Sequence, residues 1–449
     1  MTITDAGAAL RARKISCAEL VQQSLNTIER LNPKLNAFIT VTGPQAMERA
    51  HILDRELAEG RDRGPLHGIP IAHKDLIFTK GVRTTSGSKL FENDVPDHDA
   101  TVVEKLDAAG AIMVGKAGLH ELAYGVTSDN AHFGSIRNPW DPERIPGGSS
   151  GGSGVAVATG MAFMATGTDT GGSIRIPASF CGVFGLKPTY GRVSRFGVRP
   201  LGLTLDHVGP LTRTARDAEI TFQAMAPGPG LPVRQDKPVH IGVPENFYFD
   251  QVDTEITAAV QEAARRSEQS GARVWPVRVP DINALNLASF VILLSEASAV
   301  YAPYVSRRDQ FSPEAMALLD QGSLIPATSY VNAQRIRKML VDEFRALFQE
   351  IDFLYTPTIP VPPARIGEME IEVEGEKQNV RMATTRFVRG INLLGYPAVS
   401  MPCGFTKAGL PIGLQIVARP FEDEILLAWC VRLEEALGQA KACPTEWLR

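Results

Sequence analysis

Two short loops rich in glycine and serine lie in the middle of the sequence, and both could do chemistry. The first, residues 146–154, holds five glycines and three serines in nine positions and leads into a run of small residues typical of a helix. A glycine-rich turn at the start of a helix presents free backbone N–H groups and hydroxyls to a bound group. It is not a phosphate loop, because the Walker pattern requires Gly-Lys-Ser/Thr and no lysine follows here.

The second loop, residues 168–177, places Ser173 directly after Gly171 and Gly172. Consecutive glycines allow several N–H groups to converge on one point, which is the geometry that the oxyanion of an acyl transfer requires. Ser173 is therefore a candidate nucleophile. A Gly-Gly-Ser tripeptide taken alone also fits a plain turn, so the assignment depends on the residues around it.

Lys74 is the third candidate, and it lies in the apolar segment 68–77. Burial disfavours the ammonium form, so a lysine in such a segment could be neutral at neutral pH and act as a base. The alternative is a structural salt bridge, for example with the adjacent Asp75.

Together, these three pieces resemble the amidase signature family, a group of serine hydrolases that cut carbon–nitrogen bonds. The family pattern of a lysine in an apolar strand, then GGSSGG, then Asp-x-Gly-Gly-Ser-x-Arg-x-Pro appears as Lys74, residues 147–152 and residues 169–177. Ser149 lies 24 residues before Ser173, as the family pattern places its two serines. Further matching stretches extend the resemblance over nearly the whole chain: residues 181–189, 395–402 and 409–415.

This resemblance implies a Ser-Ser-Lys triad in which Lys74 deprotonates Ser149, Ser149 deprotonates Ser173, and Ser173 attacks the carbonyl carbon. Ser149 then passes a proton to the departing amine, and water cleaves the acyl-enzyme. The family also has a cis peptide bond before the first serine, here Gly148–Ser149. The oxyanion hole would consist of backbone N–H groups of the nucleophile loop: those of Thr170, Gly171, Gly172 and Ser173.

Five further residues are expected around the triad. Asp169 and Arg175 flank the nucleophile, and we expect them to pair and hold the loop in a supporting role, not in direct chemistry. Tyr124, Gly125 and Asn130 match positions where family members line the acyl or amine pocket, so we expect them to bind substrate. The sequence has no cluster of His and Cys at metal-ligand spacing, and neither a metal nor a cofactor is expected.

The order of predicted elements indicates an α/β fold. The first 60 residues read as helix, and helical and strand-like segments then alternate. A Gly- and Pro-rich loop is followed by a βαβ rhythm. We therefore expect a single large domain with a mixed, mostly parallel central sheet covered by helices on both faces. This amidase signature domain would cover residues 1–449. Within it we expect an N-terminal helical segment at 1–60, a signature core at about 61–225, a long loop at about 225–239, and a C-terminal part of the same sheet at 240–449.

Composition excludes several classes of function. The chain has 46 Lys and Arg against 50 Asp and Glu, a formal charge of -4, and no long basic run, so nucleic acid is not an expected partner. Its longest apolar stretch, residues 154–166, is short of the roughly 20 residues that a membrane-spanning helix needs, and no secretory signal is visible. The five cysteines are widely spread, which fits a reducing compartment. We therefore expect a cytoplasmic protein without membrane contact.

Two other functions share parts of this pattern. Gly147, Ser149 and Gly151 formally satisfy the nucleophile elbow of an α/β-hydrolase esterase. That fold needs a histidine late in the chain, whereas the last histidine here is His240. The amide-cleaving component of a tRNA-dependent amidotransferase, its A subunit, is the stronger alternative, because it shares the signature and residues 190–197 resemble it.

Two departures from the pattern of that amidotransferase component favour a free-standing enzyme instead. Its tyrosine-rich stretch is replaced at residues 326–332, and the acidic residue that would bind the α-amino group of glutamine, seven positions before Asn392, is Thr385. We therefore predict a monomeric or homodimeric hydrolase of small-molecule amides, anilides or carbamates, of the urethanase or aryl acylamidase type. Apolar pocket loops are expected near residues 194–205 and 285–325. A non-catalytic scaffold is disfavoured because all three triad positions are intact.

Overall fold

The computed structural model describes residues 1–226, 228 and 238–438, so most of the predicted loop at 225–239 lies outside the described residues. Within the described residues, one large sheet has eleven strands: β1 (Phe38–Val41), β2 (Pro70–Lys74), β3 (Ile112–Ala117), β4 (Met164–Asp169), β5 (Phe184–Lys187), β6 (His207–Thr212), β7 (His240–Pro244), β8 (Arg273–Val277), β9 (Phe353–Pro357), β12 (Ala398–Phe405) and β13 (Pro411–Ala418). Their order across the sheet is β1-β3-β2-β4-β6-β5-β12-β13-β9-β7-β8. Two further strands, β10 (Glu370–Val373) and β11 (Glu376–Asn379), form a separate hairpin.

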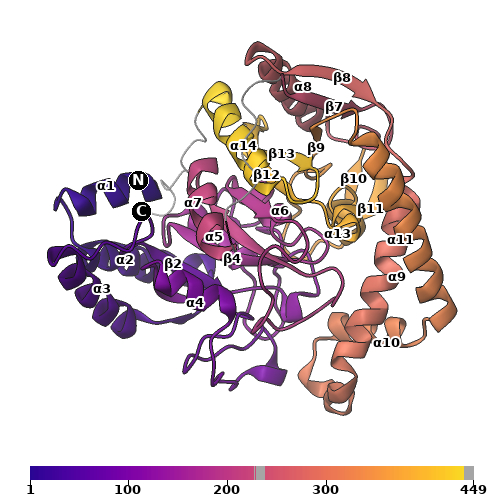
Figure 1. The fold of residues 1–449 in the computed structure, drawn as a ribbon. Coiled ribbons are helices and arrows are strands. Elements are labelled where there is room, and N and C mark those ends of the chain that lie inside the picture. Colours follow the sequence, from indigo (N-terminus) through magenta and orange to yellow (C-terminus); the bar gives the residue numbers. More distant parts are fainter. Residues whose placement is uncertain (227, 229–237, 439–449) are drawn as a thin grey trace.

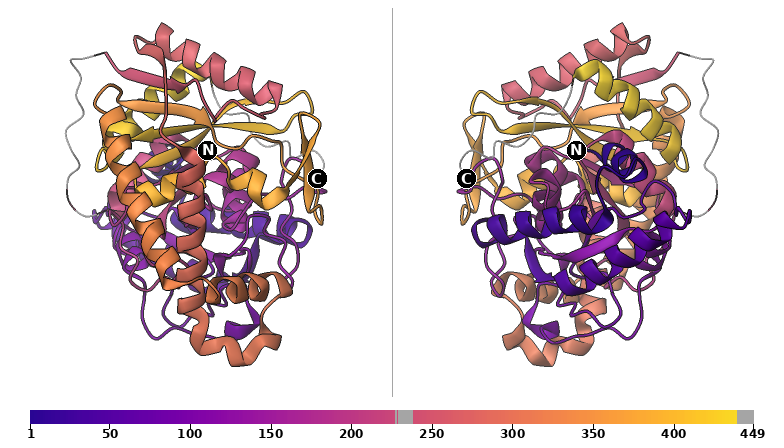
Figure 2. Two further views of the ribbon diagram at one scale, coloured as in Figure 1. Left: turned by 90° about the vertical axis from the view of Figure 1, so that its right-hand side faces the viewer. Right: turned by 90° about the vertical axis from the view of Figure 1, so that its left-hand side faces the viewer.

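Strands from both sides of the loop at 225–239 join this one sheet, and helices cover both of its faces (Figure 2). The predicted α/β class and mixed sheet are confirmed. The expectation that the sheet is mostly parallel is wrong for the described strands: four neighbouring pairs are parallel, β2–β3, β2–β4, β7–β8 and β7–β9, and six are antiparallel. Connections such as residues 406–410 between β12 and β13 are too short for the helical crossover that parallel neighbours require.

The helices of the N-terminal half are α1 (Ile3–Arg11), α2 (Cys17–Leu35), α3 (Gly43–Ala58), α4 (Thr101–Ala108), α5 (Gly151–Ala158), α6 (Arg175–Cys181) and α7 (Ala215–Met225), with short 3-10 turns η1 (Lys89–Phe91) and η2 (Glu121–Ala123). Most of the first 60 residues are helical, and β1 adds an edge strand within that segment by pairing with β3. Reciprocal capping boxes begin α1, at Thr2 and Asp5, and α2, at Ser16 and Glu19, which satisfies N–H groups that a helix start leaves free.

The C-terminal half contains α8 (Thr254–Gln269), α9 (Ile282–Tyr301), η3 (Ala302–Gln310), α10 (Pro313–Ser323), α11 (Ala327–Leu347), α12 (Val380–Thr385), α13 (Arg389–Leu394) and α14 (Asp423–Leu437). Helices α9, α10 and α11 form a layer along one side of the molecule (Figure 1). By length and composition alone, the segment Ile282–Gln310 is apolar enough to cross a membrane. In this structure α9 packs against α10, α11 and α13, and Leu285, Ile292 and Ala297 are among its buried residues.

The sheet brings the three sequence motifs to one edge. Strands β2 and β4 are parallel neighbours, so their carboxyl ends lie together. Lys74 is the last residue of β2, and Asp169 is the last residue of β4 and leads into the loop that carries Ser173. Ser149 lies two residues before α5, which packs against β4. Residues almost 100 positions apart in the sequence therefore meet at a single point.

Candidate active site

Lys74 is completely buried, and its ammonium nitrogen contacts hydroxyls instead of a carboxylate. Nζ donates to Ser149 Oγ at 2.7 Å and to Thr168 Oγ1 at 2.8 Å. Among the described residues Lys74 forms no salt bridge with Asp75: its Nζ contacts the two hydroxyls, and Asp75 Oδ2 accepts from the backbone N–H and the hydroxyl of Thr85. Burial lowers the pKa of Lys74 from 10.5 to about 7, although Asp169 and Asp206 oppose the shift. Lys74 can therefore accept a proton from Ser149 near neutral pH.

Ser149 is held in place by an unusual backbone. The peptide bond Gly148–Ser149 is cis, as the family resemblance implied. The backbone N–H of His120 donates to the carbonyl oxygen of Ser149 at 3.1 Å. A side chain at position 148 would come within 2.9 Å of Ser128 Oγ, which explains why glycine precedes the serine.

Ser173 lies on the neighbouring loop, next to this turn. The backbone N–H of Ser150 donates to the carbonyl oxygen of Ser173 at 3.2 Å, so the two serine loops are joined directly. Ser173 is 6% exposed and lines a small cavity of about 30 Å³. The structure thus brings Lys74, Ser149 and the Ser173 loop together at the edge of the sheet.

Asp169 and Arg175 form a completely buried ion pair that shapes the nucleophile loop. Asp169 Oδ1 accepts from Arg175 Nη2 at 2.9 Å, and Oδ2 accepts from Arg175 Nε at 3.0 Å. Burial alone would raise the pKa of Asp169, but the guanidinium of Arg175 holds it below its ordinary value. The guanidinium also donates to Gln415 Oε1 and to Asn392 Oδ1, each at 2.7 Å, and to the carbonyl oxygen of Val388 at 3.0 Å. These contacts tie the nucleophile loop to the pair, and the supporting role of Asp169 and Arg175 in the reaction stays a prediction.

One backbone N–H group of the expected oxyanion hole already donates a hydrogen bond within the protein. The N–H of Gly172 donates to Asp169 Oδ1 at 2.7 Å, so it points to the carboxylate in this structure. The prediction for Gly172 therefore needs correction: it anchors the loop. The N–H groups of Thr170, Gly171 and Ser173 stay as the proposed oxyanion donors.

Two of the three expected substrate-binding residues line the Ser173 cavity. Tyr124 and Gly125 are part of its wall. Asn130 is not. Its Nδ2 donates to the carbonyl oxygens of Gly87 and Leu119, and its Oδ1 accepts from the backbone of residues 132 and 133. All polar atoms of the Asn130 side chain are thus engaged in holding loops together, and we correct its expected role from binding to structure.

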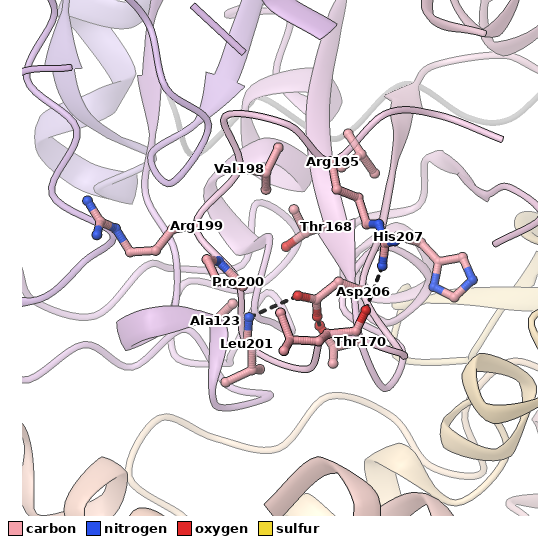
Figure 3. A pocket seen from close by; sticks show the side chains of 12 residues that line it. Ala123, Thr168, Thr170, Arg195, Val198, Arg199, Pro200, Leu201, Asp206 and His207 are labelled. Carbon is pink, nitrogen blue, oxygen red and sulfur yellow. Dashed lines mark hydrogen bonds between the residues drawn. The ribbon is translucent and has the colours of Figure 1, made fainter. Parts of the chain in front are cut away.

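A larger pocket adjoins the cavity and has a volume of about 300 Å³ (Figure 3). The two spaces share Ala123, Thr170 and Leu201. The carboxylate of Asp206 joins two of these residues, because it accepts from Thr170 Oγ1 at 2.6 Å and from the backbone N–H of Leu201 at 2.9 Å (Figure 3). The remaining wall comes mostly from the stretch expected near residues 194–205, including Arg195, Val198, Arg199, Pro200 and Leu203.

The sequence interpretation missed two basic residues of the Ser173 cavity. Arg381 and Arg389 lie in its wall, together with Thr385. Arg381 and Thr385 are four positions apart in α12 and share one of its faces, and Arg389 is the first residue of α13. The signal available in the sequence was two arginines eight positions apart beside apolar residues.

Comparison with known proteins places the chain in a family. The model of the amidase family matches residues 19–427, and the chain belongs to this family of amidase signature enzymes. Two relatives are the A subunits of glutamyl-tRNA(Gln) amidotransferases. The chain is 38% identical to the one from Geotalea daltonii, over 95% of each protein, and 35% identical to the one from Alkaliphilus metalliredigens, over 99% of the chain and 98% of the relative.

Solved structures give the same fold. A protein described as part of a vestigial complex that reveals the origins of an s-triazine catabolic enzyme has a TM-score of 0.92 and 34% identity, over 98% of this chain and all of that one. A bacterial aryl acylamidase has a TM-score of 0.87 and 27% identity, over 97% of this chain and 96% of that one.

These relatives correct two sequence predictions. We predicted a free-standing hydrolase of amides, anilides or carbamates, which is contradicted by relatives at 35–38% identity that are named as components of an amidotransferase. The prediction of a monomer or homodimer with only a small-molecule substrate and no nucleic acid fails for the same reason. The departures at Thr385 and at residues 326–332 are local, whereas the identity extends over nearly the whole chain. What holds is an amidase-family enzyme that acts on carbon–nitrogen bonds.

Proposed function

We propose that the chain is the amide-cleaving subunit of an amidotransferase, which releases ammonia from a primary amide for use by a partner protein. Ser173 Oγ attacks the amide carbon while its proton passes to Ser149 and the proton of Ser149 passes to Lys74. The tetrahedral intermediate collapses, the C–N bond breaks, and the same relay returns a proton to the departing nitrogen. Water then hydrolyses the ester on Ser173, and the acid leaves.

One observation carries this reaction: the 2.7 Å contact between Lys74 Nζ and Ser149 Oγ in a fully buried site that lowers the pKa of the lysine to about 7. A base must be within hydrogen-bond reach of the proton that it takes, and its pKa should lie near the working pH. Lys74 meets both conditions. The N–H groups of Thr170, Gly171 and Ser173 would stabilise the negative charge that develops on the carbonyl oxygen.

The role in an assembly rests on the relatives, which are named as components of a glutamyl-tRNA(Gln) amidotransferase and match over almost their entire length. A cytoplasmic location goes with this proposal. Among the described cysteines, Cys17, Cys403 and Cys430 are free thiols, as expected in a reducing compartment. Cys443 lies outside the described residues.

The experiment is to purify the tagged chain from its own host with whatever proteins stay bound, and to measure ammonia release from glutamine and ammonia transfer to glutamyl-tRNA(Gln). We expect both activities in the assembly and neither in its Ser173→Ala variant. Full hydrolytic activity of the chain alone, with no copurifying protein and no transfer to tRNA, would reject the role in an assembly while leaving the Ser173 chemistry intact.

A further inference from the structure

Asp206 places a buried carboxylate beside the residues of the proposed reaction. It is 9% exposed, lines the larger pocket and bonds to Thr170 and Leu201, which belong to both cavities (Figure 3). Its donors among the described residues are all neutral: the hydroxyl of Thr170 at 2.6 Å and the backbone N–H groups of Leu201 at 2.9 Å and Gly202 at 3.1 Å. Burying a carboxylate without a paired cation is costly, so Asp206 is a candidate for a part in the reaction.

The pairing of β4 with β6 explains why Asp206 lies on the same side as Lys74. These strands are antiparallel, and their register sets Asp206 opposite Thr170, one position beyond the last pair of the ladder. Residues opposite each other in such a pair have their side chains on one face, and Thr168 shares that face with Thr170 because side chains alternate along an extended chain. Lys74 Nζ donates to Thr168 Oγ1 at 2.8 Å. The amine of Lys74, the two threonine hydroxyls and the carboxylate of Asp206 therefore gather on one side of β4.

Asp206 holds one end of the proposed oxyanion loop. The hydroxyl of Thr170 donates to Asp206, and the N–H of Gly172 donates to Asp169 at 2.7 Å. Gly171 lies between these two anchors. An oxyanion hole stabilises charge only when its donors are already in position, so an anchor at Thr170 contributes to the rate.

Asp206 also acts on Lys74 through space. Burial lowers the pKa of Lys74 to about 7, while the charges of Asp169 and Asp206 favour its ammonium form. The charge of Asp169 is already matched by the guanidinium of Arg175. Asp206 is thus the carboxylate that remains to stabilise the ammonium formed when Lys74 takes the proton of Ser149.

The other charged and titratable groups near this pair do not supply that charge. They lie on β2, β3, β6, α9 and the loop before β6: His73, Asp75, Lys116, His207, Tyr301, Arg195 and Arg199. Helix α5 contains none. Burial lowers the pKa of both histidines, which are neutral near pH 7. Asp75 accepts from Thr85, and Arg199 donates to the carboxylate of Asp94, so neither replaces Asp206 at Lys74.

We propose that Asp206 is a positioning residue of the Ser173 reaction, which holds Thr170 in the oxyanion loop and provides the negative charge that faces Lys74. This inference rests on the proposed amide cleavage and adds a residue to it. Asp206 acts through Thr170 and Lys74 and not on the substrate. The two effects are separable, because the position of Thr170 sets the maximal rate and the charge sets the pH at which Lys74 becomes a base.

The first test removes the charge and keeps the shape. The rate at which a fluorophosphonate labels Ser173 is measured from pH 5 to 9 in Asp206→Asn and in the unmodified chain, each with its copurifying partners. Loss of an opposite charge lowers the pKa of a lysine, so we expect the midpoint near 7 to move down by about one pH unit. Labelling at pH 5 then reaches about a tenth of its plateau instead of about a hundredth. Asp206→Glu keeps the charge and should keep the midpoint, and an unmoved midpoint in folded Asp206→Asn overturns the role of the charge.

The second test separates position from charge. Thr170→Val removes the hydroxyl that Asp206 binds and leaves the carboxylate, so we expect a plateau lower by about tenfold with an unchanged midpoint. Thr170→Ser retains a hydroxyl and should recover most of the rate. If Asp206 acts through Thr170, the double variant Thr170→Val with Asp206→Asn should lose much less than the product of the two single losses. A loss equal to that product, or a normal plateau in Thr170→Val, overturns the positioning role.

Asp423→Asn is the matched control. Asp423 is also buried, and it accepts from the backbone N–H and the hydroxyl of Thr189 at 2.8 and 2.6 Å. It should leave the midpoint of labelling unchanged, and a shift as large as that of Asp206→Asn would overturn the proposal because it would report a loss of stability. If circular dichroism shows that Asp206→Asn is unfolded, the Thr170 variants decide.

The two levels of inference fail in different ways. If Ser173 of the unmodified chain is not labelled, or its labelling has no midpoint near pH 7, the proposed amide cleavage fails. If the unmodified chain behaves as expected but Asp206→Asn and Thr170→Val do not differ from it, only the assignment of Asp206 fails.

Discussion

Replacement of Lys74 by arginine tests the base that the mechanism requires. Arginine keeps the positive charge but does not lose its proton in this pH range, so it cannot accept the proton of Ser149. Lys74 has a pKa of about 7 and is half neutral at pH 7. At its ordinary pKa, only about one lysine in 3,000 would be neutral at that pH. We therefore expect Lys74→Arg to lower the rate of Ser173 labelling by about 10²- to 10⁴-fold, the usual contribution of a general base.

The same reasoning predicts the pH profile of the unmodified chain. Below a pKa of about 7 the neutral fraction of Lys74 falls tenfold for each pH unit, so labelling at pH 5 should be about a hundredfold slower than its alkaline plateau. The assay is the second-order rate of fluorophosphonate labelling from pH 5 to 9, with the modified peptide identified by mass spectrometry. A folded Lys74→Arg protein that labels at nearly the normal rate, or a profile with its midpoint near pH 5, removes Lys74 from the mechanism.

A stability measurement adds an independent check. The folded pKa of Lys74 lies below its unfolded value, so the unfolded chain binds more protons between pH 7 and 10.5, and this lysine destabilises the fold increasingly as pH falls through that window. The difference corresponds to on the order of 5 kcal/mol at pH 7, before the hydrogen bonds to Ser149 and Thr168 are considered. Lys74→Met should therefore be more stable than the unmodified chain at pH 7, and the gain should shrink toward pH 10.

Lys116 supplies the matched control for these experiments. It is also completely buried, and burial lowers its pKa to about 8. Its Nζ donates to the hydroxyls of Thr79 and Thr84 and to the carbonyl oxygen of Ile77, away from both serines. Lys116→Met should leave the midpoint of Ser173 labelling unchanged once circular dichroism shows that the variant is folded. A shift of that midpoint would mean that the profile reports global stability and not the base.

Three further predictions concern the rest of the site. Ser173→Ala should abolish acyl-enzyme formation, whereas Ser149→Ala should leave slow labelling of Ser173, because it removes only the proton relay. Mass spectrometry of the labelled peptides distinguishes the two variants. Labelling at Ser149 would contradict the assignment. Asp169→Asn should destabilise the fold by about 3–5 kcal/mol in urea unfolding, because Arg175 loses its buried counter-charge; a loss below about 1 kcal/mol would show that the pair is dispensable. Thiol alkylation should leave labelling unchanged, since burial raises the pKa of thiols such as Cys17 to about 12, and inactivation by iodoacetamide at neutral pH would contradict this.

The sequence predicted the parts of the site whose chemistry is local. Neighbouring residues alone were enough to predict three features of the site: the glycine before Ser149, the two glycines before Ser173, and the lysine in an apolar strand. The antiparallel share of the sheet was missed because strand direction depends on connections whose length only becomes clear once strand ends are known. The hydrogen bonds of Asn130 and Gly172 were missed for a related reason: the sequence does not show which acceptor an amide side chain or a backbone N–H will meet in the folded chain. The Asn130 side chain donates to the carbonyl oxygen of Gly87, and the N–H of Gly172 donates to the carboxylate of Asp169.

Three buried cations around Ser173 illustrate why residue type alone could not separate their roles. Arg175 keeps its charge and is satisfied by the carboxylate of Asp169, so it stabilises the loop. Lys74 has no carboxylate partner among the described residues, and burial lowers its pKa to about 7, so it can exist as the neutral base that the reaction needs. Arg389 also lacks a carboxylate there, but with a pKa of about 9 it stays mostly protonated at neutral pH. Arg389 is thus a protonated cation in the wall of the Ser173 cavity that no carboxylate of the described residues neutralises; it differs in this from Arg175, which is paired, and from Lys74, which can lose its proton.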